Sequence, residues 1–213
     1  TQAGIMQGKM IGEYVLEHFD ELDLNHDGKI SYVMFKGDEA NQEAIARTKY
    51  GVECADEVLT AAGKPALEVY DAGNANKYLV DLNGTWSNTA SFDYMQTILA
   101  QYNEANNNMV EVVICNNDDM AMAAARAAKG NAAYAKTIFV GFDGIQSACN
   151  AILAGEETMS VAQEAYDMGY KAVEAAVKAV NGETLDKFID SGCSVVTKDN
   201  AQERLDTLKG YIG

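Results

Sequence analysis

The sequence is poor in the residues that characterise several classes of protein. Two histidines, one tryptophan and one proline occur among 213 residues, and the 16 Lys and Arg are half as many as the 32 Asp and Glu. The resulting net charge of −16 argues against nucleic acid as a partner, because binding phosphates needs a basic face. His18 and His26 are too few and too far apart to indicate a zinc site.

Long apolar runs and closely spaced cysteines are also missing. No run approaches membrane-spanning length, and the first residues do not read as a signal peptide. The four cysteines show no C-x-x-C pattern, so we expect buried free thiols, with a disulfide or a metal cluster as the lesser alternative. The hydrophobic content of 48% is ordinary for a globular protein, and the length suits one large domain or one domain with part of another.

An acidic loop near the N-terminus has the pattern of the first two-thirds of a calcium loop. Oxygen-bearing side chains alternate along it and a glycine follows the third of them: Asp23, Asn25, Asp27 and Gly28. Carboxylates and amides are the ligands of a hard cation, and the glycine permits the sharp turn. The position that holds a bidentate glutamate in an EF-hand is Met34, and residues 30–35 favour a strand. The loop is therefore either a solvated turn or a site whose last carboxylate comes from elsewhere.

Helical and strand patterns alternate along the rest of the chain. Short apolar strands separated by longer helices predict right-handed βαβ units in an α/β fold with a doubly wound parallel sheet, buried on both faces. Residues 71–86 are too polar for a core element and are expected to form a loop. We expect helices at 4–19, 41–62, 88–102, 118–129, 145–153, 165–180 and 200–211, and strands at 30–35, 67–70, 111–115, 137–142, 158–162 and 193–197.

Polar side chains follow several strands at the edge where such sheets bind ligands. The candidates are Asn41, Glu43, Arg47, Asn117, Asp143 and Gln163, and the loop 71–86 adds Trp86. Amides, carboxylates and a guanidinium suit vicinal hydroxyl groups, while an indole suits the C–H face of a pyranose ring. One arginine among several carboxylates leaves no positively charged pocket, so the set favours a neutral polyhydroxylated ligand.

Each candidate also has a simpler structural interpretation. Asn41 and Asn117 fit helix N-caps, and Glu43 with Arg47 fits an i, i+4 pair that supports its own helix. The tryptophan could be loop packing and the aspartate a turn residue. Their common position at one edge nevertheless favours a binding cleft.

The acidic loop should lie at the opposite, amino edge of the sheet. The strand expected beside residues 30–35 opens there with Glu111, which could supply the missing carboxylate. The predicted calcium ligands are then the side chains of Asp23, Asn25 and Asp27, the carbonyl of Lys29, Ser31 directly or through water, and Glu111. A turn without metal is the alternative.

These motifs together resemble the galactose/glucose-binding type of bacterial periplasmic binding protein (type 1). The resemblance is carried by Asp-Leu-Asn-x-Asp-Gly before a strand, Lys36-Gly37, Glu43-x-x-x-Arg47-Thr48, and Glu111-Val-Val-Ile-Cys-Asn-Asn-Asp118 followed by Met120-Ala-Met122. It runs over essentially the whole chain. It implies a two-lobed, hinge-closing receptor, in the periplasm or as a cell-surface lipoprotein of a Gram-positive bacterium.

The resemblance also implies a bound ion, a sugar ligand and protein partners for such a receptor. It would carry a structural calcium ion and deliver its sugar to the membrane permease of an ABC importer and, in some bacteria, to a chemoreceptor. The sugar contacts of the type match Glu43, Arg47, Trp86, Asn117, Asp143 and Gln163, with Asn41 where a histidine is usual. Glu43 and Gln163 are one methylene longer than the aspartate and asparagine usual at these positions. Glucose or galactose is the first expectation for the ligand.

The type has a first lobe ahead of this region, so the chain is expected to be a fragment. Residues 1–163 would form the second lobe with the calcium site and half of the cleft. Residues 164–190 would pack on the absent lobe, and 191–213 would return as a strand and the C-terminal helix. The apolar stripe of helix 165–180 then lacks cover, and we expect the helix to repack or self-associate.

Solute binding without catalysis is the favoured function. A calcium-binding regulatory module is the alternative, but the loop lacks the exit helix whose movement transmits a sensor's signal. A glycosidase that uses Glu43 and Asp143 is less favoured, since both carboxylates have a ready binding role. A DNA-binding repressor is disfavoured by the charge and by the lack of a helix-turn-helix pattern.

Overall fold

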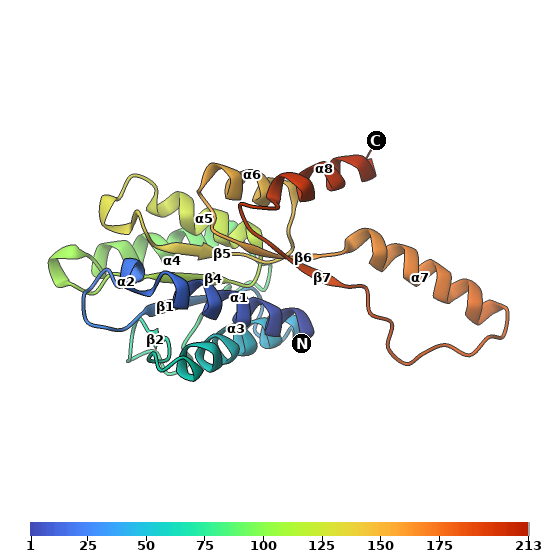
Figure 1. The fold of residues 1–213 in the computed structure, drawn as a ribbon, viewed down its shortest axis with the longest axis horizontal. Helices are drawn as coiled ribbons and strands as arrows, with labels where there is room; N and C mark the ends of the chain where they lie inside the picture. Colours follow the sequence, from blue (N-terminus) through green and yellow to red (C-terminus); the bar gives the residue numbers. More distant parts are fainter. Residues whose placement is uncertain (213) are drawn as a thin grey trace.

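A sheet covered by helices on both faces forms the body of the protein in the computed structural model, which describes residues 1–212 (Figure 1). The strands are β1 Ser31–Lys36, β2 Glu68–Val69, β3 Leu79–Val80, β4 Val112–Cys115, β5 Ile138–Val140, β6 Ser160–Gln163 and β7 Cys193–Val196. The α-helices are α1 Gln2–Glu17, α2 Phe19–Leu22, α3 Gln42–Ala61, α4 Asn88–Gln101, α5 Asp118–Ala128, α6 Gln146–Ala154, α7 Ala165–Val180 and α8 Ala201–Ile212. Short 3₁₀ turns lie at Glu104–Asn106 and Ala132–Tyr134.

The main sheet has the strand order β2-β1-β4-β5, with β3 pairing farther along β1, and every pair in it is parallel. Tyr32 lies opposite Val112 and Phe35 opposite Cys115, so β4 is the neighbour of β1, as predicted. Single bridges, such as that between Val140 and Met159, place β6 beside β5. The predicted parallel α/β sheet is confirmed.

The strands are buried on both faces because their side chains alternate between two cores. Met34 and Ile114 pack on one face under α1 and α3, while Phe35 and Cys115 pack on the other under α4 and α5. Gly8 allows α1 to approach α3 closely, since a Cβ there would collide with a backbone carbonyl of α3. These cores fix the turns that carry the candidate ligand residues.

Three features of the fold differ from the pattern expected from the sequence. Strand β3 lies within residues 71–86, which are predicted to form a loop, and pairs with the end of β1. The N-terminal helical region is divided into α1 and α2, which meet at residue 18. Strand β7 pairs with β6 in antiparallel direction, with Ala162 opposite Ser194, because the chain leaves β6 for α7 and then returns along the same path. Cys54, Cys115 and Cys149 are buried free thiols, as expected, and Cys193 is a half-buried one.

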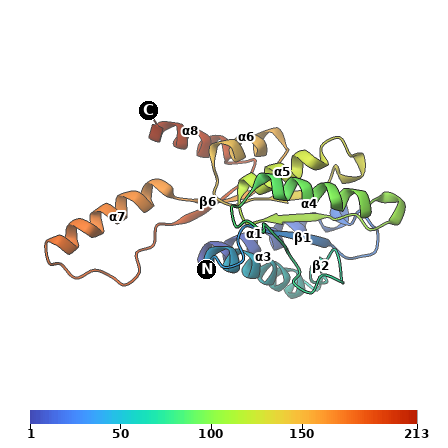
Figure 2. The ribbon, with the colours of Figure 1, turned by 180° about the vertical axis from the view of Figure 1, so that it is seen from behind.

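Helix α7 and the segment 181–192 project from the body as an arm, which is seen from both sides (Figures 1 and 2). No residue of this helix is buried within the described chain, and its exposed apolar side chains include Tyr170, Val173 and Val177. The base of the arm is fixed to α8 by an ion pair between Arg204 and Glu164, with Nη1 and Oε2 2.6 Å apart. The arm is thus anchored at one end and uncovered along its length.

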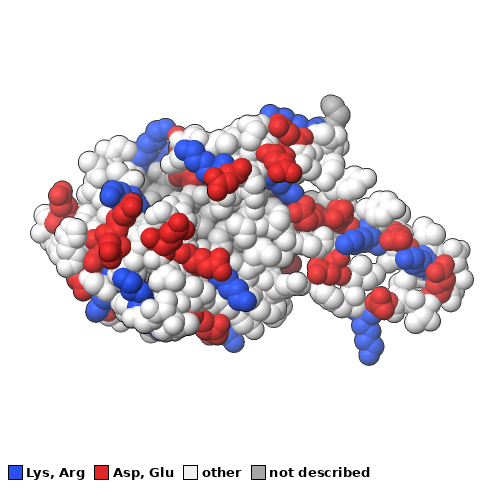
Figure 3. Space-filling view, in the orientation of Figure 1, with Lys and Arg blue, Asp and Glu red and all other residues white. Residues whose placement is uncertain are grey.

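The surface of the body carries charges of both signs. On the face drawn in Figure 3, lysine and arginine side chains are dispersed among acidic ones. Across residues 1–212, no helix has both the length and the apolar character needed to cross a membrane.

Candidate functional site

The guanidinium of Arg47 is the centre of the candidate site. The side chain is 7% exposed and comes from the second turn of α3, at the carboxyl edge of the sheet. Its Nη2 donates to Glu43 Oε2 over 2.9 Å, and its Nη1 donates to the carbonyl of Asn116 over 2.6 Å. The same Nη1 lies 3.4 Å from Asp143 Oδ1. One cation therefore holds two carboxylates and the turn after β4.

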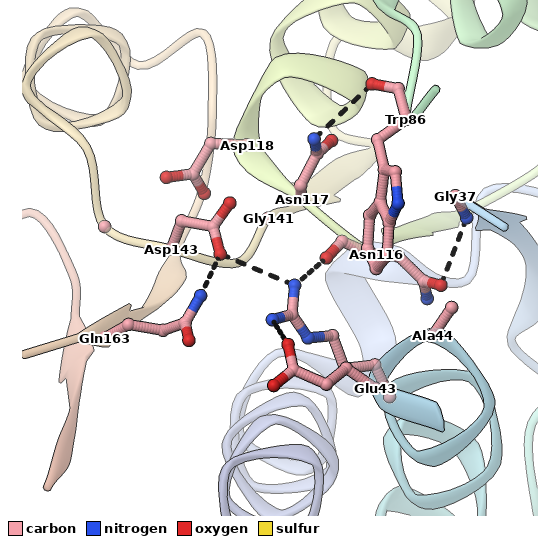
Figure 4. Close-up of polar contacts among 12 residues, drawn as sticks. Gly37, Glu43, Ala44, Trp86, Asn116, Asn117, Asp118, Gly141, Asp143 and Gln163 are labelled. Atoms are coloured by element: carbon pink, nitrogen blue, oxygen red, sulfur yellow. Dashed lines mark hydrogen bonds and ion pairs between the residues drawn. The ribbon is translucent and has the colours of Figure 1, made fainter. Parts of the chain in front are cut away.

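Aromatic rings enclose the same guanidinium. The Arg47 carbon Cζ lies 3.7 Å from the centre of the Phe142 ring and 5.3 Å from that of Trp86. The indole lies against Gly37, where a Cβ would collide with it. Figure 4 shows Trp86 beside both Asn116 and Gly37. Cation–π contacts of this kind hold both the cation and the ring in place.

Asp143 follows β5 and faces the arginine from the other side. Gln163 Nε2 donates to Asp143 Oδ1, so the carboxylate lies between an amide and a guanidinium (Figure 4). Burial raises the pKa of Asp143, whereas the charge of Arg47 and the hydrogen bond from Gln163 lower it. The backbone of Asp143 has φ of 113°, a strained value for a non-glycine residue.

Asn41 and Asn117 both serve as helix N-caps. Asn41 Oδ1 accepts from the backbone N–H groups of Glu43 and Ala44, and Asn117 Oδ1 accepts from that of Met120. The amide of Asn117 also donates to the Trp86 carbonyl over 3.4 Å. Both asparagines are therefore helix N-caps, which is the simpler interpretation of their positions in the sequence.

The structure brings six of the seven predicted edge residues into one polar network. Glu43, Arg47, Asp143 and Gln163 form one chain of contacts, and Asn117 touches Trp86, which lies over Arg47. Asn41 is linked to it only through the backbone of Glu43. The sequence does not indicate the contacts that Phe142 and Asn116 make with Arg47. An apolar residue at the end of a strand and the first of two asparagines have no pattern that predicts such a contact.

The space beside this network is small. A hollow of about 80 Å³ is lined by Glu43, Arg47, Phe142, Gln163 and the first turn of α1. Pockets that enclose small ligands measure roughly 300–1,000 Å³, so this hollow is several times smaller than such a pocket. A larger hollow of about 950 Å³ lies elsewhere, between the ends of α5 and α6, and contains none of the predicted residues.

The acidic loop is closed by its own carboxylates at the opposite edge of the sheet. Asp23 accepts from the backbone N–H groups of Asp27 and Gly28, and Asp27 accepts from that of Lys29. Gly28 has φ of 76°, as the expected sharp turn requires. The Lys29 ammonium pairs with Glu68 and points to a neighbouring strand.

Glu111 reaches the loop from β4, but its oxygens are occupied by protein donors. Oε2 accepts from the N–H of Ser31 over 2.6 Å and from its hydroxyl over 3.0 Å, and Oε1 accepts from the backbone and side-chain nitrogens of Asn25. Asn25 turns inward and exchanges two hydrogen bonds with the backbone of Met109. Burial raises the pKa of Glu111 to about 7, although these donors lower it.

The buried half of the loop therefore does not have the arrangement of a calcium site. Within residues 1–212, no three His, Cys, Asp or Glu side chains are grouped so that they could hold a metal. The oxygen-rich chemistry of the loop suits calcium. Asn25 and Glu111, however, would have to give up these hydrogen bonds to coordinate the ion, so calcium stays a prediction.

Comparison with known proteins agrees with this architecture. The profile of the periplasmic binding protein domain matches residues 1–184. The D-galactose/methyl-galactoside binding periplasmic protein of Haemophilus influenzae is 28% identical over 183 residues, which are 86% of this chain and 49% of that protein. A putative rhizopine-binding protein of Rhizobium meliloti is 31% identical over 178 residues, 83% of this chain and 52% of that protein. The chain thus spans about half the length of these relatives.

Solved structures share the fold over nearly the whole chain. An ABC transporter solute binding protein from Bacillus halodurans, solved with bound myo-inositol, gives a TM-score of 0.72 at 22% identity, covering 95% of this chain and 61% of that one. A Mycobacterium smegmatis protein in complex with β-D-fucofuranose gives 0.74 at 17% identity, covering 98% and 61%. The profile match spans most of the chain, from α1 through α7, and the chain belongs to the periplasmic binding protein family.

Proposed function

We propose that this chain is part of an extracytoplasmic receptor that binds a monosaccharide, with glucose or galactose as the first candidates. The receptor would deliver its sugar to the membrane permease of an ABC importer, and a chemoreceptor is a further candidate partner. The observation that carries the proposal is the network around Arg47, which combines charged hydrogen-bonding groups and an indole at the carboxyl edge of the sheet. We assign no catalytic step to it.

The charges of the network favour a neutral ligand. Arg47 is already paired with Glu43 and Asp143, so its charge is not free to attract an anion. Carboxylate oxygens that keep free lone pairs accept hydrogen bonds from hydroxyl groups, and the guanidinium holds them in a fixed orientation. A polyhydroxylated ring fits such a fork better than a phosphate does.

The printed ligands of the relatives fit this chemistry. Galactose, myo-inositol and fucofuranose are named for the proteins described above, and all three carry several hydroxyl groups on a ring. Glu43 and Gln163 each have a longer side chain than the galactose/glucose type usually has. A displaced polar contact costs roughly 1–3 kcal/mol, so these two residues are where we expect the choice of sugar to be made.

A glycosidase is less well supported than a binding protein. Its two carboxylates would be Glu43 and Asp143, and here both contact the same guanidinium. Each carboxylate therefore already has a positioning role as a partner of Arg47. Hydrolysis of aryl glycosides by the purified protein would speak for the enzyme.

We further propose that the arm packs against a part of the receptor outside this chain, so that its apolar side chains are buried there. Tyr166 is 55% exposed, and Val173 and Val177 are 66% and 56% exposed, which is unusual for a helix with such an apolar stripe. The region 1–163 would then be one lobe, 164–190 the connection to the other, and 191–213 the return. The arm's ring stack of Tyr166 on Tyr211, with centres 4.6 Å apart, covers only its base.

A calcium ion in the acidic loop is our second structural proposal. It would be held by Asp23, Asn25, Asp27, the Lys29 carbonyl, Ser31 and Glu111 and would stabilise the lobe without touching the sugar. Binding requires Asn25 to release Met109 and Glu111 to release Ser31. The donor types support the proposal, while the present hydrogen bonds oppose it.

Replacing Asp143 by asparagine in the full-length receptor should weaken sugar binding about tenfold or more. The variant keeps the shape of the side chain but loses a charged acceptor, which contributes about 1.5–3 kcal/mol. Isothermal titration against a panel of monosaccharides measures the effect. Asp119→Asn, an exposed change in the first turn of α5, is the control and should bind normally. Equal affinities for the two variants would contradict the assignment.

Calcium should raise the melting temperature of the chelator-treated chain by about 5–10 °C at a hundredfold excess over its Kd, because a ligand that binds only the folded state stabilises it. Glu111→Gln should remove this response, and Glu104→Gln, on the exposed 3₁₀ turn, should retain it. A melting temperature that is independent of calcium would mean that the hydrogen bonds of Glu111 alone close the loop.

The isolated chain should self-associate through the arm. Size-exclusion chromatography with light scattering should show a concentration-dependent dimer, and the double variant Val173→Gln, Val177→Gln should stay monomeric because its apolar stripe is interrupted. Glu174→Gln changes the same helix without removing apolar area and should still dimerise. A monomeric wild-type chain that binds no hydrophobic dye would refute the expectation.

A further inference from the structure

Two carboxyl groups lie buried together beneath the ligand edge, outside the network described above. Asp118 is fully buried and Glu157 is 2% exposed. Both face Gly141, at which a Cβ would collide with Asp118 Oδ1 and with Glu157 Oε1. Two acids from different elements, the first turn of α5 and the segment before β6, therefore share one dry space.

The two carboxyl groups differ in the hydrogen bonds that they accept. Asp118 Oδ1 accepts from the hydroxyl of Ser160 over 2.6 Å, and its Oδ2 accepts from the N–H of Ile145 over 3.0 Å. Neither carboxyl oxygen of Glu157 has a hydrogen-bond partner among residues 1–212 that could donate to it. A buried carboxylate without donors is costly, whereas a protonated carboxyl group can itself donate to the neighbouring acid.

Within the part of the chain that the structure describes, no ion pair joins Asp118 or Glu157 to a cation. Asp119 and Asp143, together with the thiols of Cys115 and Cys149, act on the pair from α5, the β5–α6 turn, β4 and α6. The cations of the surroundings are engaged elsewhere. Arg47 already serves Glu43 and Asp143, and Arg204 of α8, whose Nε lies 3.4 Å from the carbonyl of Gly144, is paired with Glu164. Burial raises the pKa of Asp118 to about 7, and burial followed by the charge of Asp118 raises that of Glu157 well above its ordinary value.

Asp118 also connects the two turns that carry candidate ligand residues. It follows Asn117 directly, and its own N–H donates to the carbonyl of Phe142, over 2.8 Å. Its carboxylate holds Ile145, so both ends of the turn that contains Asp143 are fixed to one residue. Ser160, the other partner of that carboxylate, additionally accepts from the N–H of Gly144.

We propose that Glu157 and Asp118 share a single proton near neutral pH, and that this proton positions Asn117 and Asp143 for the ligand. The protonated carboxyl group of Glu157 donates a hydrogen bond to the Asp118 carboxylate. When it is lost, two adjacent buried charges repel each other, and the anchors of Asp118 to Ser160 and Ile145 loosen. Ligand affinity then falls as the pH rises. The positioning role rests on the proposed function, but the proton does not.

The direction of the stability effect follows from proton linkage. The folded chain holds a proton that the unfolded chain releases above the ordinary carboxyl pKa, about 4.3. The contribution of this pair to the free energy of unfolding is therefore highest at mildly acidic pH and decreases as the pH rises toward the pKa of the pair. One proton corresponds to a tenfold decrease in the folding equilibrium constant for each pH unit in that interval.

Glu157→Gln tests the proton, because glutamine has the same shape, is neutral at every pH and still donates. Urea unfolding of this chain between pH 5 and 7 measures how the folding equilibrium constant changes with pH. For each pH unit, this constant should fall up to tenfold more in the wild type and in Glu156→Gln, an exposed neighbour, than in Glu157→Gln. Equal slopes in all three proteins would overturn the proposal. Should the variant not fold, the carboxyl ¹³C signal of Glu157 in the wild type decides. Titration near pH 4.5 would refute the shared proton, and titration well above that value supports it.

The positioning role has its own readouts. The amide N–H signals of Gly144 and Ile145 should move with pH in the wild type and stay fixed in Glu157→Gln. In the full-length receptor, sugar affinity should decrease above neutral pH in the wild type but not in the variant. Amide signals that ignore the titration would overturn the positioning role. Absence of sugar binding at every pH, together with the expected slope and amide shifts, would refute the proposed function and leave the proton pair supported.

Discussion

A buried guanidinium on which three turns converge is the constraint that organises the carboxyl edge of this lobe. Arg47 binds a carboxylate of its own helix, the carbonyl that ends β4 and the carboxylate that follows β5. A buried charge that loses a partner costs several kcal/mol, so these turns have little freedom to separate. The candidate ligand residues are thereby held in place by the protein itself, which is the preorganisation that tight and selective binding requires.

The opposite edge of the sheet is fixed by a buried carboxylate in place of a cation. Glu111 accepts four hydrogen bonds from Asn25 and Ser31 and so ties the acidic loop to β4. The two edges are separated by the length of the strands. The network of Arg47 and the hydrogen bonds of Glu111 therefore lie at opposite ends of the same strands.

Much of this arrangement could be predicted from the sequence because it depends on local patterns. The alternation of apolar strands with amphipathic helices determines the parallel sheet, and the ends of its strands determine which residues share an edge. The meeting of Glu111 with the acidic loop followed from the same reasoning, although what its oxygens bind did not. Hydrogen bonds such as those from Ser31 depend on side-chain orientations that spacing does not encode.

Other features depend on contacts between distant segments and were not predictable. The antiparallel return of β7 reflects the path of the chain around the arm, and the pairing of Asp118 with Glu157 brings together residues that look unrelated in sequence. Asn41 and Asn117 show a second limit of prediction from the sequence, because one local pattern fits two roles. Their capping role was the simpler of two interpretations, and the sequence pattern is the same for a cap and for a ligand-binding amide.

We propose that this chain supplies one wall of a sugar cleft, centred on Arg47, and that the other wall lies outside it. Isothermal titration of glucose and galactose against the isolated chain and against the full-length receptor tests this claim most directly. We predict that the full-length receptor binds one of these sugars or a close relative, and that the isolated chain binds weakly or not at all. Micromolar binding by the isolated chain, or no binding of any monosaccharide by the full-length receptor, would contradict it.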